Sequence, residues 1–357
     1  MRWKGFSDIP ADVLAIPLVG ARTLVLAARA IVRRPLRALR ACAALMRERY
    51  PVRAKLKNLA VIPKGLALAE LARTQRFDRL HAYWLSTPAT VAWLASRVSG
   101  IPFSATTHRW DLYENNMARR KLADASFIRT ISARGRADLL RMTAGDERKV
   151  RLVRIGVPLS PVAPDSPQRG PATPLRILCA ARLVAVKGHR DLIEALALLR
   201  RRDVPFVCTL AGSGELRDEL ERRIASAGLL DRVRLAGTIA HDELVARLQA
   251  GEWDVSVIAS IERRDGLMEG VPVALLEAMA AGVVVVATDS GAIGELVDAE
   301  TGLLVPHSQP DALAAALAQL SGDRGLYERL RHAARERVER EFDARRTAAT
   351  LRELISA

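Results

Sequence analysis

Short apolar runs alternate with longer segments of helical periodicity along most of this chain. The runs at residues 103–107, 177–180, 206–210 and 283–287 have the length and composition of buried strands. Between them, apolar residues recur every three or four positions, as over residues 87–99, which predicts amphipathic helices. Strands that alternate with helices form parallel sheets with both faces covered, so the pattern predicts an α/β fold. Further strands are expected at residues 79–84, 127–132 and 150–155 and near Val233, Val255 and Leu303, and a further helix is expected over residues 59–75.

A proline-rich stretch interrupts this alternation and divides the chain of 357 residues, which has room for two domains of ordinary size. Residues 158–174 hold six prolines, which excludes regular secondary structure there and predicts a linker. We therefore expect an N-terminal domain at residues 1–157 and a C-terminal domain at residues 175–341, each a doubly wound Rossmann-like sheet. Ligands bind such sheets at the carboxyl ends of their strands.

The first part of the chain has a different character. Residues 18–32 are apolar with helical spacing, but Pro17, Arg22 and Arg29 leave no run of about 20 uncharged residues that could cross a bilayer. An amphipathic helix is the better interpretation. Such a helix lies either on a membrane surface or on the body of the protein.

Charge is distributed unevenly between the two halves. The net charge is +15, but residues 1–170 carry 31 Lys and Arg against 12 Asp and Glu, whereas the remainder carries 24 against 28. Residues 33–57 contain nine cations and a single acid, Glu48. Such a run binds nucleic acid, binds anionic lipid, or is only a solvated surface. Nucleic acid is the weakest alternative because no known binding module accompanies the charge, whereas each cation near an anionic leaflet contributes about 1 kcal/mol.

The three cysteines, Cys42, Cys179 and Cys208, have neither the spacing of a metal site nor that of a disulfide framework. Two of them lie within apolar runs, so we interpret them as small core residues in a reducing compartment. No metal site is expected.

Two glutamates mark the clearest candidate site. Glu269 and Glu277 are separated by seven residues, and Pro272 between them is suited to the first position of a helix. The amides and the dipole of that helix start favour a bound phosphate. Carboxylates would repel a phosphate that they touched, so they are expected to accept hydrogen bonds from sugar or ribose hydroxyls. The alternative for such a pair is a solvated helix face and a loop charge, but the surrounding Gly, Pro and small residues favour a nucleotide site.

This stretch resembles the retaining GT-B glycosyltransferases of family 4, whose signature is E-G-x-P-x-x-L-L-E-A-M-A. In this chain the signature residues are Glu269, Gly270, Pro272, Leu275, Leu276, Glu277, Ala278, Met279 and Ala280. The resemblance implies that Glu269 contacts the donor sugar and that Glu277 contacts the nucleotide ribose. It also implies that the helix start near Gly270 and Val271 faces the diphosphate.

A second segment, ILCAARLVAVKGHRDLIEAL, resembles the G-R-L-x-x-x-K-G element of the same family, with Ala181 where the family has Gly. It gives Arg182 and Lys187 as counterparts, after an apolar run and therefore at the carboxyl end of a strand. Cations there suit a diphosphate, whereas a lone arginine is otherwise part of a surface salt bridge. Gly212, in the turn after residues 206–210, is family-like too, but a strand-to-helix turn needs glycine in any case.

The N-terminal half carries one family-like element. The segment IPFSATTHRWDLYENN resembles the T-A-H-x-x-D-I-Y segment of polysaccharide-building members, and it places His108 and Asp111 after a strand. The resemblance implies that His108 donates to the donor sugar or stabilises charge, whereas a lone histidine is more often structural. We interpret His81 as a structural or acceptor-side residue.

The resemblance covers roughly residues 56–340. It implies a GT-B fold whose last helix, within residues 342–357, crosses back to the N-terminal domain. Family members begin with a strand and a Gly- or Ser-rich loop that have no counterpart here, so the N-terminal domain is expected to lack its first βα units.

Together these features predict a metal-independent, retaining glycosyltransferase that moves a hexose from a nucleotide-diphosphate sugar and needs no cofactor. The predicted catalytic residues are His108 and Glu269, and the predicted donor-binding residues are Arg182, Lys187, Gly212, Gly270, Val271 and Glu277. The expected acceptor is a lipid-linked saccharide of an envelope glycan or exopolysaccharide, at the cytoplasmic face of an anionic membrane, and no nucleic acid partner is expected. The alternative is a catalytically incomplete nucleotide-sugar-binding protein.

Overall fold

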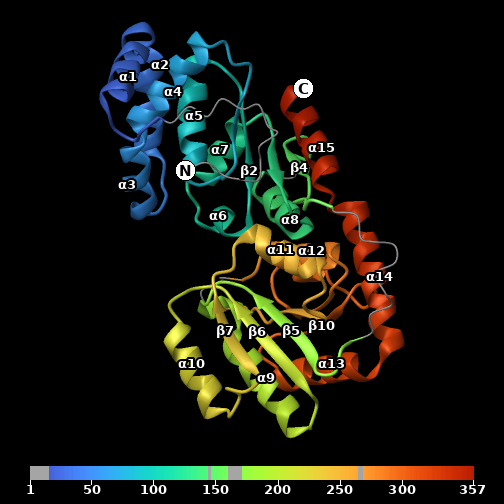
Figure 1. Ribbon diagram of the computed structural model, residues 1–357. Coiled ribbons are helices and arrows are strands. Elements are labelled where there is room, and N and C mark those ends of the chain that lie inside the picture. Colours follow the sequence, from blue (N-terminus) through green and yellow to red (C-terminus); the bar gives the residue numbers. More distant parts are fainter. Residues whose placement is uncertain (1–15, 144–145, 160–170, 264–267) are drawn as a thin grey trace. The chain divides into compact units, whose positions relative to one another are not determined.

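The computed structural model describes residues 16–143, 146–159, 171–263 and 268–357. Its contacts divide the chain into two compact units, whose helices and strands are labelled in Figure 1. Unit 1 contains the described residues up to Thr107 and those of Asp111–Arg129 and Met142–Val150, and unit 2 contains those of His108–Trp110, Thr130–Arg141 and Arg151–Ala357. Most of the proline-rich stretch at residues 158–174 lies outside the described residues, so the domain boundaries drawn from it stay predictions.

Four short strands form the first sheet, in the order β1-β2-β3-β4. Their bounds are β1 Leu80–Ala82, β2 Phe103–Thr107, β3 Ile128–Thr130 and β4 Val150–Leu152. β1 and β2 pair in parallel, with Leu80 opposite Phe103. β2 is buried along its whole length although it contains hydroxyl side chains. His81 of β1 satisfies two of them, because its Nδ1 lies 2.8 Å from Ser104 Oγ and its Nε2 lies 3.0 Å from Thr106 Oγ1.

The helices of this half are α1 Ala21–Arg33, α2 Pro35–Arg47, α3 Val52–Ala60, α4 Ile62–Thr74, α5 Thr87–Ser99, α6 Arg109–Tyr113 and α7 Ala118–Asp124. The helix predicted over residues 59–75 is α4, but it begins at Ile62 rather than Leu59, because α3 ends at Ala60 and the two helices are separated at Val61. Pro63 lacks the N–H that a continuous helix needs, and its ring would meet the carbonyl group of Leu59.

α1 and α2 bury stripes of small residues. The buried residues are Thr23, Ala27 and Ala30 on α1 and Ala38, Ala41 and Leu45 on α2. α1 packs along α4, α2 contacts α5, and α4 and α5 pack on each other. The amphipathic helix predicted over residues 18–32 is therefore confirmed as α1. In the part of the chain that the structure describes, no helix has the length and apolar character needed to cross a bilayer.

Unit 2 is built on a six-stranded parallel sheet in the order β10-β9-β8-β5-β6-β7. The bounds are β5 Leu175–Ala180, β6 Phe206–Ala211, β7 Val233–Gly237, β8 Val255–Ile258, β9 Val284–Asp289 and β10 Leu303–Pro306. From β5 the chain first builds one side of the sheet with β6 and β7, and then the other side with β8, β9 and β10. β5 and β8 are therefore neighbours whose connections leave in opposite directions, which is where ligands bind to sheets of this kind.

The helices of this half, labelled in Figure 1, are α8 Ala133–Met142, α9 His189–Arg201, α10 Arg217–Ser226, α11 His241–Gln249, α12 Val273–Ala280, α13 Pro310–Gly322, α14 Arg324–Glu341 and α15 Ala344–Ser356, with 3-10 turns η1 Ala185–Lys187 and η2 Ile293–Glu295. Of these, α12, α13 and α14 contact strands of the six-stranded sheet. Strand residues are buried on both faces of this sheet, as Ile177 and Val286 are on one face and Leu178 and Val285 on the other, which explains why the strands of this half are near-continuous apolar runs.

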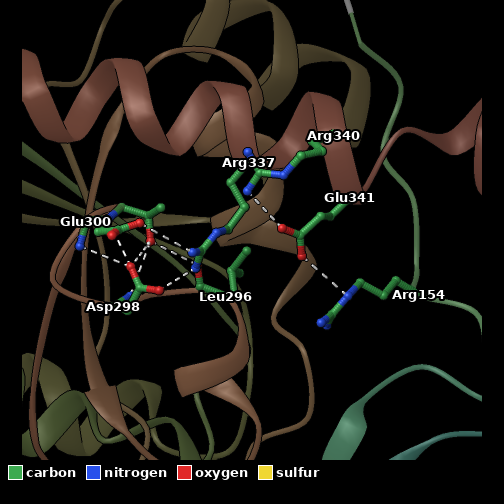
Figure 2. Close-up of polar contacts among 8 residues, drawn as sticks. Arg154, Leu296, Asp298, Glu300, Arg337, Arg340 and Glu341 are labelled. Carbon is green, nitrogen blue, oxygen red and sulfur yellow. Dashed lines mark hydrogen bonds and ion pairs between the residues drawn. The ribbon is translucent and has the colours of Figure 1, made fainter.

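Ion pairs fix α14 to the loop that follows η2, as Figure 2 shows. Arg337 Nη1 lies 2.6 Å from Asp298 Oδ2, and the backbone amide groups of Glu300 and Thr301 donate to the other oxygen of Asp298. Near the end of α14, Glu341 Oε2 lies 3.6 Å from Arg154 Nε. These contacts hold α14 against the loop after η2 and the segment that carries Arg154. The crossing of the final helix to the N-terminal domain stays a prediction.

Candidate functional site

Lys187 and Glu269 meet at the carboxyl ends of β5 and β8. Lys187 closes the turn η1 after β5, and its Nζ donates to Glu269 Oε2 at 2.6 Å. Ser260, which follows β8, donates from its Oγ to the same carboxylate oxygen at 2.8 Å. Both members of the ion pair are mostly buried, with side chains 18% and 12% exposed. The chain therefore brings an ammonium, a carboxylate and a hydroxyl together between β5 and β8, where the strand order of the sheet reverses.

The turn after β9 holds the backbone of Glu269 in place. Ala292 N donates to Glu269 O at 3.3 Å, and a Cβ on Gly291 would lie 1.8 Å from that same oxygen. Gly291 also has a φ of +64°, which favours glycine. A side chain at this position would displace the Glu269 backbone, so Gly291 is required for the position of the carboxylate.

Helix α12 starts directly after the Glu269 loop. Pro272, predicted at the first helical position, is its N-cap instead, and Val273 is its first residue. Gly270 and Val271 precede the helix, Val271 is buried, and no side chain of the described residues caps the helix start. Glu277 lies in the second turn, as predicted.

Glu277 has a partner that the sequence analysis did not single out. Its Oε1 lies 2.7 Å from Nε2 of His241, the first residue of α11. The Glu277 side chain is only 10% exposed, whereas that of His241 is 63% exposed. The hydrogen bond to Glu277 raises the pKa of His241 above its usual value of 6.5, although partial burial opposes the shift. No local motif marks His241, because its role depends on a carboxylate 36 positions further along the chain.

Arg182 and Gly212 follow the neighbouring strands β5 and β6. The Arg182 side chain is exposed and forms no hydrogen bond or ion pair with other described residues. Gly212 packs against the loop that carries Arg182, since a Cβ on it would lie 2.0 Å from Ala181 O. Close packing of the two loops is thus sufficient to require glycine at this position, whether or not a ligand approaches it.

The family-like segment of the N-terminal half has one firmly structural member. Asp111 is buried, and its carboxylate accepts hydrogen bonds from Leu85 N at 2.7 Å and from Thr107 Oγ1 at 2.8 Å. Asp111 therefore ties the end of β2 to the loop after β1. His108 follows β2 directly and is partly buried.

His81 is a structural residue. Both of its ring nitrogens are engaged by hydroxyl groups of β2. Burial, together with the nearby Arg129 guanidinium, lowers the pKa of His81 to about 4. The ring is therefore neutral at physiological pH and links two strands.

The cysteines are free thiols. Cys179 and Cys208 are buried on β5 and β6, and burial raises the pKa of both thiols. Among the described residues, no group of three or more His, Cys, Asp or Glu side chains is arranged to hold a metal ion.

Residues 165–337 match the family model described as Glycosyl transferases group 1. This part of the chain is a glycosyltransferase group 1 domain. The predicted donor-binding residues, from Arg182 to Glu277, all lie inside this domain, as do His241 and Gly291. The match confirms the resemblance to this family that the two motifs indicated.

Curated glycosyltransferases are similar to the chain over about half of its length. The chain is 37% identical over 211 residues to the putative colanic acid biosynthesis glycosyltransferase WcaL of Escherichia coli (strain K12), covering 58% of this chain and 51% of that protein. It is 38% identical over 183 residues to the amylovoran biosynthesis glycosyltransferase AmsK of Erwinia amylovora, covering 51% and 44%. It is also 34% identical over 181 residues to a GDP-mannose-dependent alpha-(1-6)-phosphatidylinositol monomannoside mannosyltransferase of Mycobacterium tuberculosis, covering 50% and 46%. The chain thus spans about half the length of these relatives.

Solved structures share the fold. Anabaena Alr3699/HepE in complex with UDP superposes with a TM-score of 0.67 at 21% identity, covering 81% of this chain and 82% of that chain. The apo form of the lipopolysaccharide outer core galactosyltransferase WaaB superposes with a TM-score of 0.65 at 18% identity, covering 85% and 82%. The predicted α/β architecture of GT-B type, with two parallel sheets, is therefore confirmed.

Proposed function

We propose that the chain is a glycosyltransferase that moves a hexose from a nucleotide-diphosphate sugar to a saccharide acceptor. The main support is the Lys187–Glu269 pair at the β5/β8 edge of the group 1 domain, because it places a cation and a hydroxyl-binding carboxylate side by side. A nucleotide-diphosphate sugar needs both, a cation for its diphosphate and an acceptor for its sugar hydroxyls.

The donor is held by residues at the carboxyl ends of the strands of unit 2. Arg182, Lys187 and the amides near Gly270 and Val271 stabilise the diphosphate as it takes up negative charge on leaving. These groups take the place of a divalent metal ion, so the reaction is metal-independent. Glu277 accepts hydrogen bonds from the ribose hydroxyls, and the loop at Gly212 allows a close approach of the backbone.

Transfer proceeds with retention of the anomeric configuration. The acceptor hydroxyl oxygen bonds to the anomeric carbon on the face from which the diphosphate departs, while the bond from that carbon to the diphosphate oxygen breaks. The acceptor proton moves to the leaving diphosphate, so the products are a glycoside and a nucleoside diphosphate. Glu269 orients the sugar hydroxyls during this exchange, and His108 acts near the sugar.

The acceptor is a lipid-linked saccharide in the synthesis of an exopolysaccharide or envelope glycan. Two relatives are named for the biosynthesis of colanic acid and amylovoran, and a third is named for a phosphatidylinositol mannoside acceptor. A saccharide carried on a lipid is compatible with all three names. It would place the enzyme at the cytoplasmic face of a membrane.

The test is a screen of UDP- and GDP-hexoses with the purified chain in the presence of EDTA. Lipid extracts that contain saccharide-linked lipids serve as acceptors, and NMR of the product reports its anomeric configuration. A product with retained configuration is expected. Binding of a nucleotide sugar without any turnover would instead support the catalytically incomplete binding protein, and the lack of any binding would refute both.

A further inference from the structure

α1 exposes the large apolar residues that an ordinary helix would bury. Its inward stripe consists of alanines and a threonine, whereas Leu24 and Val25 are each 50% exposed, Ile31 is 46% exposed and Val32 is 80% exposed. Leu24 and Ile31 are seven positions apart, as are Val25 and Val32, so the four side chains form one continuous stripe along two helical turns. A helix that faces only water and its own core normally places such residues inward.

α2 repeats this inverted arrangement. Ala38, Ala41 and Leu45 are turned inward, whereas Leu36, Leu39 and Met46 are 65%, 68% and 47% exposed. Val52 and Leu56 continue the exposed series on α3. Most of the exposed large apolar side chains in the described part of the chain fall between Leu18 and Leu56. A concentration of this kind marks an interaction surface, whereas single exposed apolar residues are ordinary.

Cations border both apolar stripes. On α1, Arg22 and Arg29 are seven positions apart, so they share one side of the helix. That side is adjacent to the row formed by Val25 and Val32. On α2, a hollow of about 890 Å³ opens beside Leu39. Its charged lining residues are Arg40, Arg47, Glu48, Arg49 and Arg120. Four guanidinium groups and one carboxylate give the hollow a strong positive charge.

Three of these arginines have no carboxylate partner in the part of the chain that the structure describes. Within the described ranges, no carboxylate lies at ion-pair distance from Arg40, Arg47 or Arg49, whereas Arg120 Nε is held 3.2 Å from Asp124 Oδ2. A guanidinium presents two parallel donors that match phosphate oxygens. The hollow therefore fits a phosphate group that is attached to an apolar body.

We propose that the outward faces of α1 and α2 form a docking surface for a bilayer that contains anionic phospholipid. The exposed leucines, valines and Ile31 enter the boundary between headgroups and acyl chains, and the arginine-lined hollow takes lipid phosphate. This surface goes beyond the proposed function, because its residues lie outside the glycosyltransferase domain at residues 165–337.

Charge and composition favour a bilayer over other partners. A two-fold dimer through this face would place arginines of one copy against those of the other, which is repulsive. Nucleic acid needs the cations but gains little from a stripe of exposed aliphatic side chains, and base stacking needs aromatic residues, of which α1 and α2 have none. An anionic bilayer is complementary to both parts of the surface.

The test is flotation of the full chain with two kinds of vesicle, phosphatidylcholine alone and phosphatidylcholine with phosphatidylglycerol. The wild-type protein should float with the anionic vesicles at low salt, float far less at high salt, and float poorly with the neutral vesicles. Two double variants test the two parts of the surface separately. Val32→Ser with Leu39→Ser changes the apolar part, and Arg40→Gln with Arg47→Gln changes the basic part. Each should weaken vesicle partitioning by at least about tenfold.

Matched controls are Leu230→Ser and Arg201→Gln, which change an exposed apolar residue and an exposed cation of unit 2. Both controls should float like the wild type, and UDP and GDP affinity should be the same in all variants.

Equal flotation of wild type and surface variants, or equal binding to neutral vesicles, would overturn the docking surface. A surface-dependent dimer mass in solution, or RNA retardation that the arginine variant abolishes without any vesicle binding, would overturn it in favour of those partners. Since nucleotide affinity is measured separately, a failure of docking and a failure of the donor site are distinguishable.

Discussion

Lys187 Nζ lies 2.6 Å from Glu269 Oε2, although the two residues are 82 positions apart in the chain. The contact joins the segment after β5 to the segment after β8. The strand order of the sheet reverses between these two strands. The two family-like motifs and the sheet topology therefore indicate the same edge of the sheet. The proposed donor chemistry depends on this contact.

Replacing Lys187 by Ala should reduce glycosyl transfer by about a hundredfold or more, because one donor that stabilises a leaving group contributes roughly two to three orders of magnitude in rate. Turnover of the donor identified by the screen is the measurement, with the melting temperature as a check of folding. Arg201→Ala removes an exposed cation from α9 and should leave both quantities unchanged. Unchanged turnover in Lys187→Ala would exclude the assigned role.

A ribose contact by Glu277 can be measured with a double-mutant cycle that uses nucleotide analogues. Wild-type protein should bind 2′,3′-dideoxy UDP or GDP about tenfold more weakly than the natural nucleotide, since a hydrogen bond to a carboxylate contributes about 1.5 kcal/mol or more. Glu277→Ala should bind both nucleotides equally, at the weaker affinity. A Glu277→Ala protein that still distinguishes them by the wild-type factor would show that another residue reads the ribose.

His241 should make nucleotide affinity depend on pH. Below its pKa, which the hydrogen bond to Glu277 raises above 6.5, the imidazolium competes for the carboxylate that we assign to the ribose. Affinity should therefore rise about two- to fivefold from about pH 6 to about pH 8, in keeping with the small energy of an exposed ion pair. The ion pair itself stabilises the fold below pH 6.5, and this stabilisation is lost as the pH rises through the raised pKa. Calorimetric titration should show a flat pH profile for His241→Ala, and an unchanged slope in that variant would exclude the competition.

Gly291→Ala tests whether the turn after β9 positions Glu269. The added Cβ would lie 1.8 Å from Glu269 O, whereas Gly282, with a similar positive φ, has nothing within 4 Å of its added Cβ. Gly282→Ala should cost only the backbone strain of about 1 to 2 kcal/mol in unfolding free energy. Gly291→Ala should cost more and should also lower turnover, because it displaces the carboxylate. Denaturant unfolding and turnover are measured for both variants. Identical effects of the two substitutions would show that the turn does not position Glu269.

The Asp298–Arg337 pair in Figure 2 should make stability sensitive to acid. Burial raises the pKa of Asp298, but the hydrogen bonds from Arg337, Glu300 N and Thr301 together lower it below 3.8. The carboxylate therefore stabilises the fold above pH 3.8, and this contribution is lost as the pH falls through the lowered pKa. Asp298→Asn should cost about 1 kcal/mol at neutral pH, since Asp298 is partly exposed and screened.

Urea unfolding at neutral and acid pH measures this contribution. Asp311→Asn, which changes the exposed partner of Arg202, should cost nearly nothing. A difference between Asp298→Asn and wild type that stays constant down to the acid limit would contradict the assignment.

The sheet of unit 2 could be predicted from sequence because its strands are buried on both faces. Ile177, Cys208 and Val286 contact the core on one face of the sheet, and Leu178 and Val285 contact the core on the other, so each strand is a nearly unbroken apolar run. The break at Val61 was missed because helical periodicity continues through it, although Pro63 on its own is a sufficient signal.

The orientation of α1 could not be predicted from periodicity. Its alanine stripe and its leucine and valine stripe are both apolar, so a hydrophobic pattern indicates a helix without saying which stripe faces the core. Close packing against α4 favours the small residues, and the large residues are left outside. The site residues Lys187 and Glu269 came from motifs, whereas His241 is defined by a long-range contact that no local pattern records.

The most direct test of the donor site is calorimetric titration of UDP and GDP into wild-type protein, Lys187→Ala and Arg201→Ala, each with EDTA present. At least one of the two nucleotides should bind the wild-type and Arg201→Ala proteins with the same affinity. Lys187→Ala should bind that nucleotide about tenfold or more weakly, as expected for the loss of one charge-assisted contact to a diphosphate. Equal affinity of Lys187→Ala and wild type, or nucleotide binding that is found only when EDTA is left out, would contradict a metal-independent diphosphate site at Lys187.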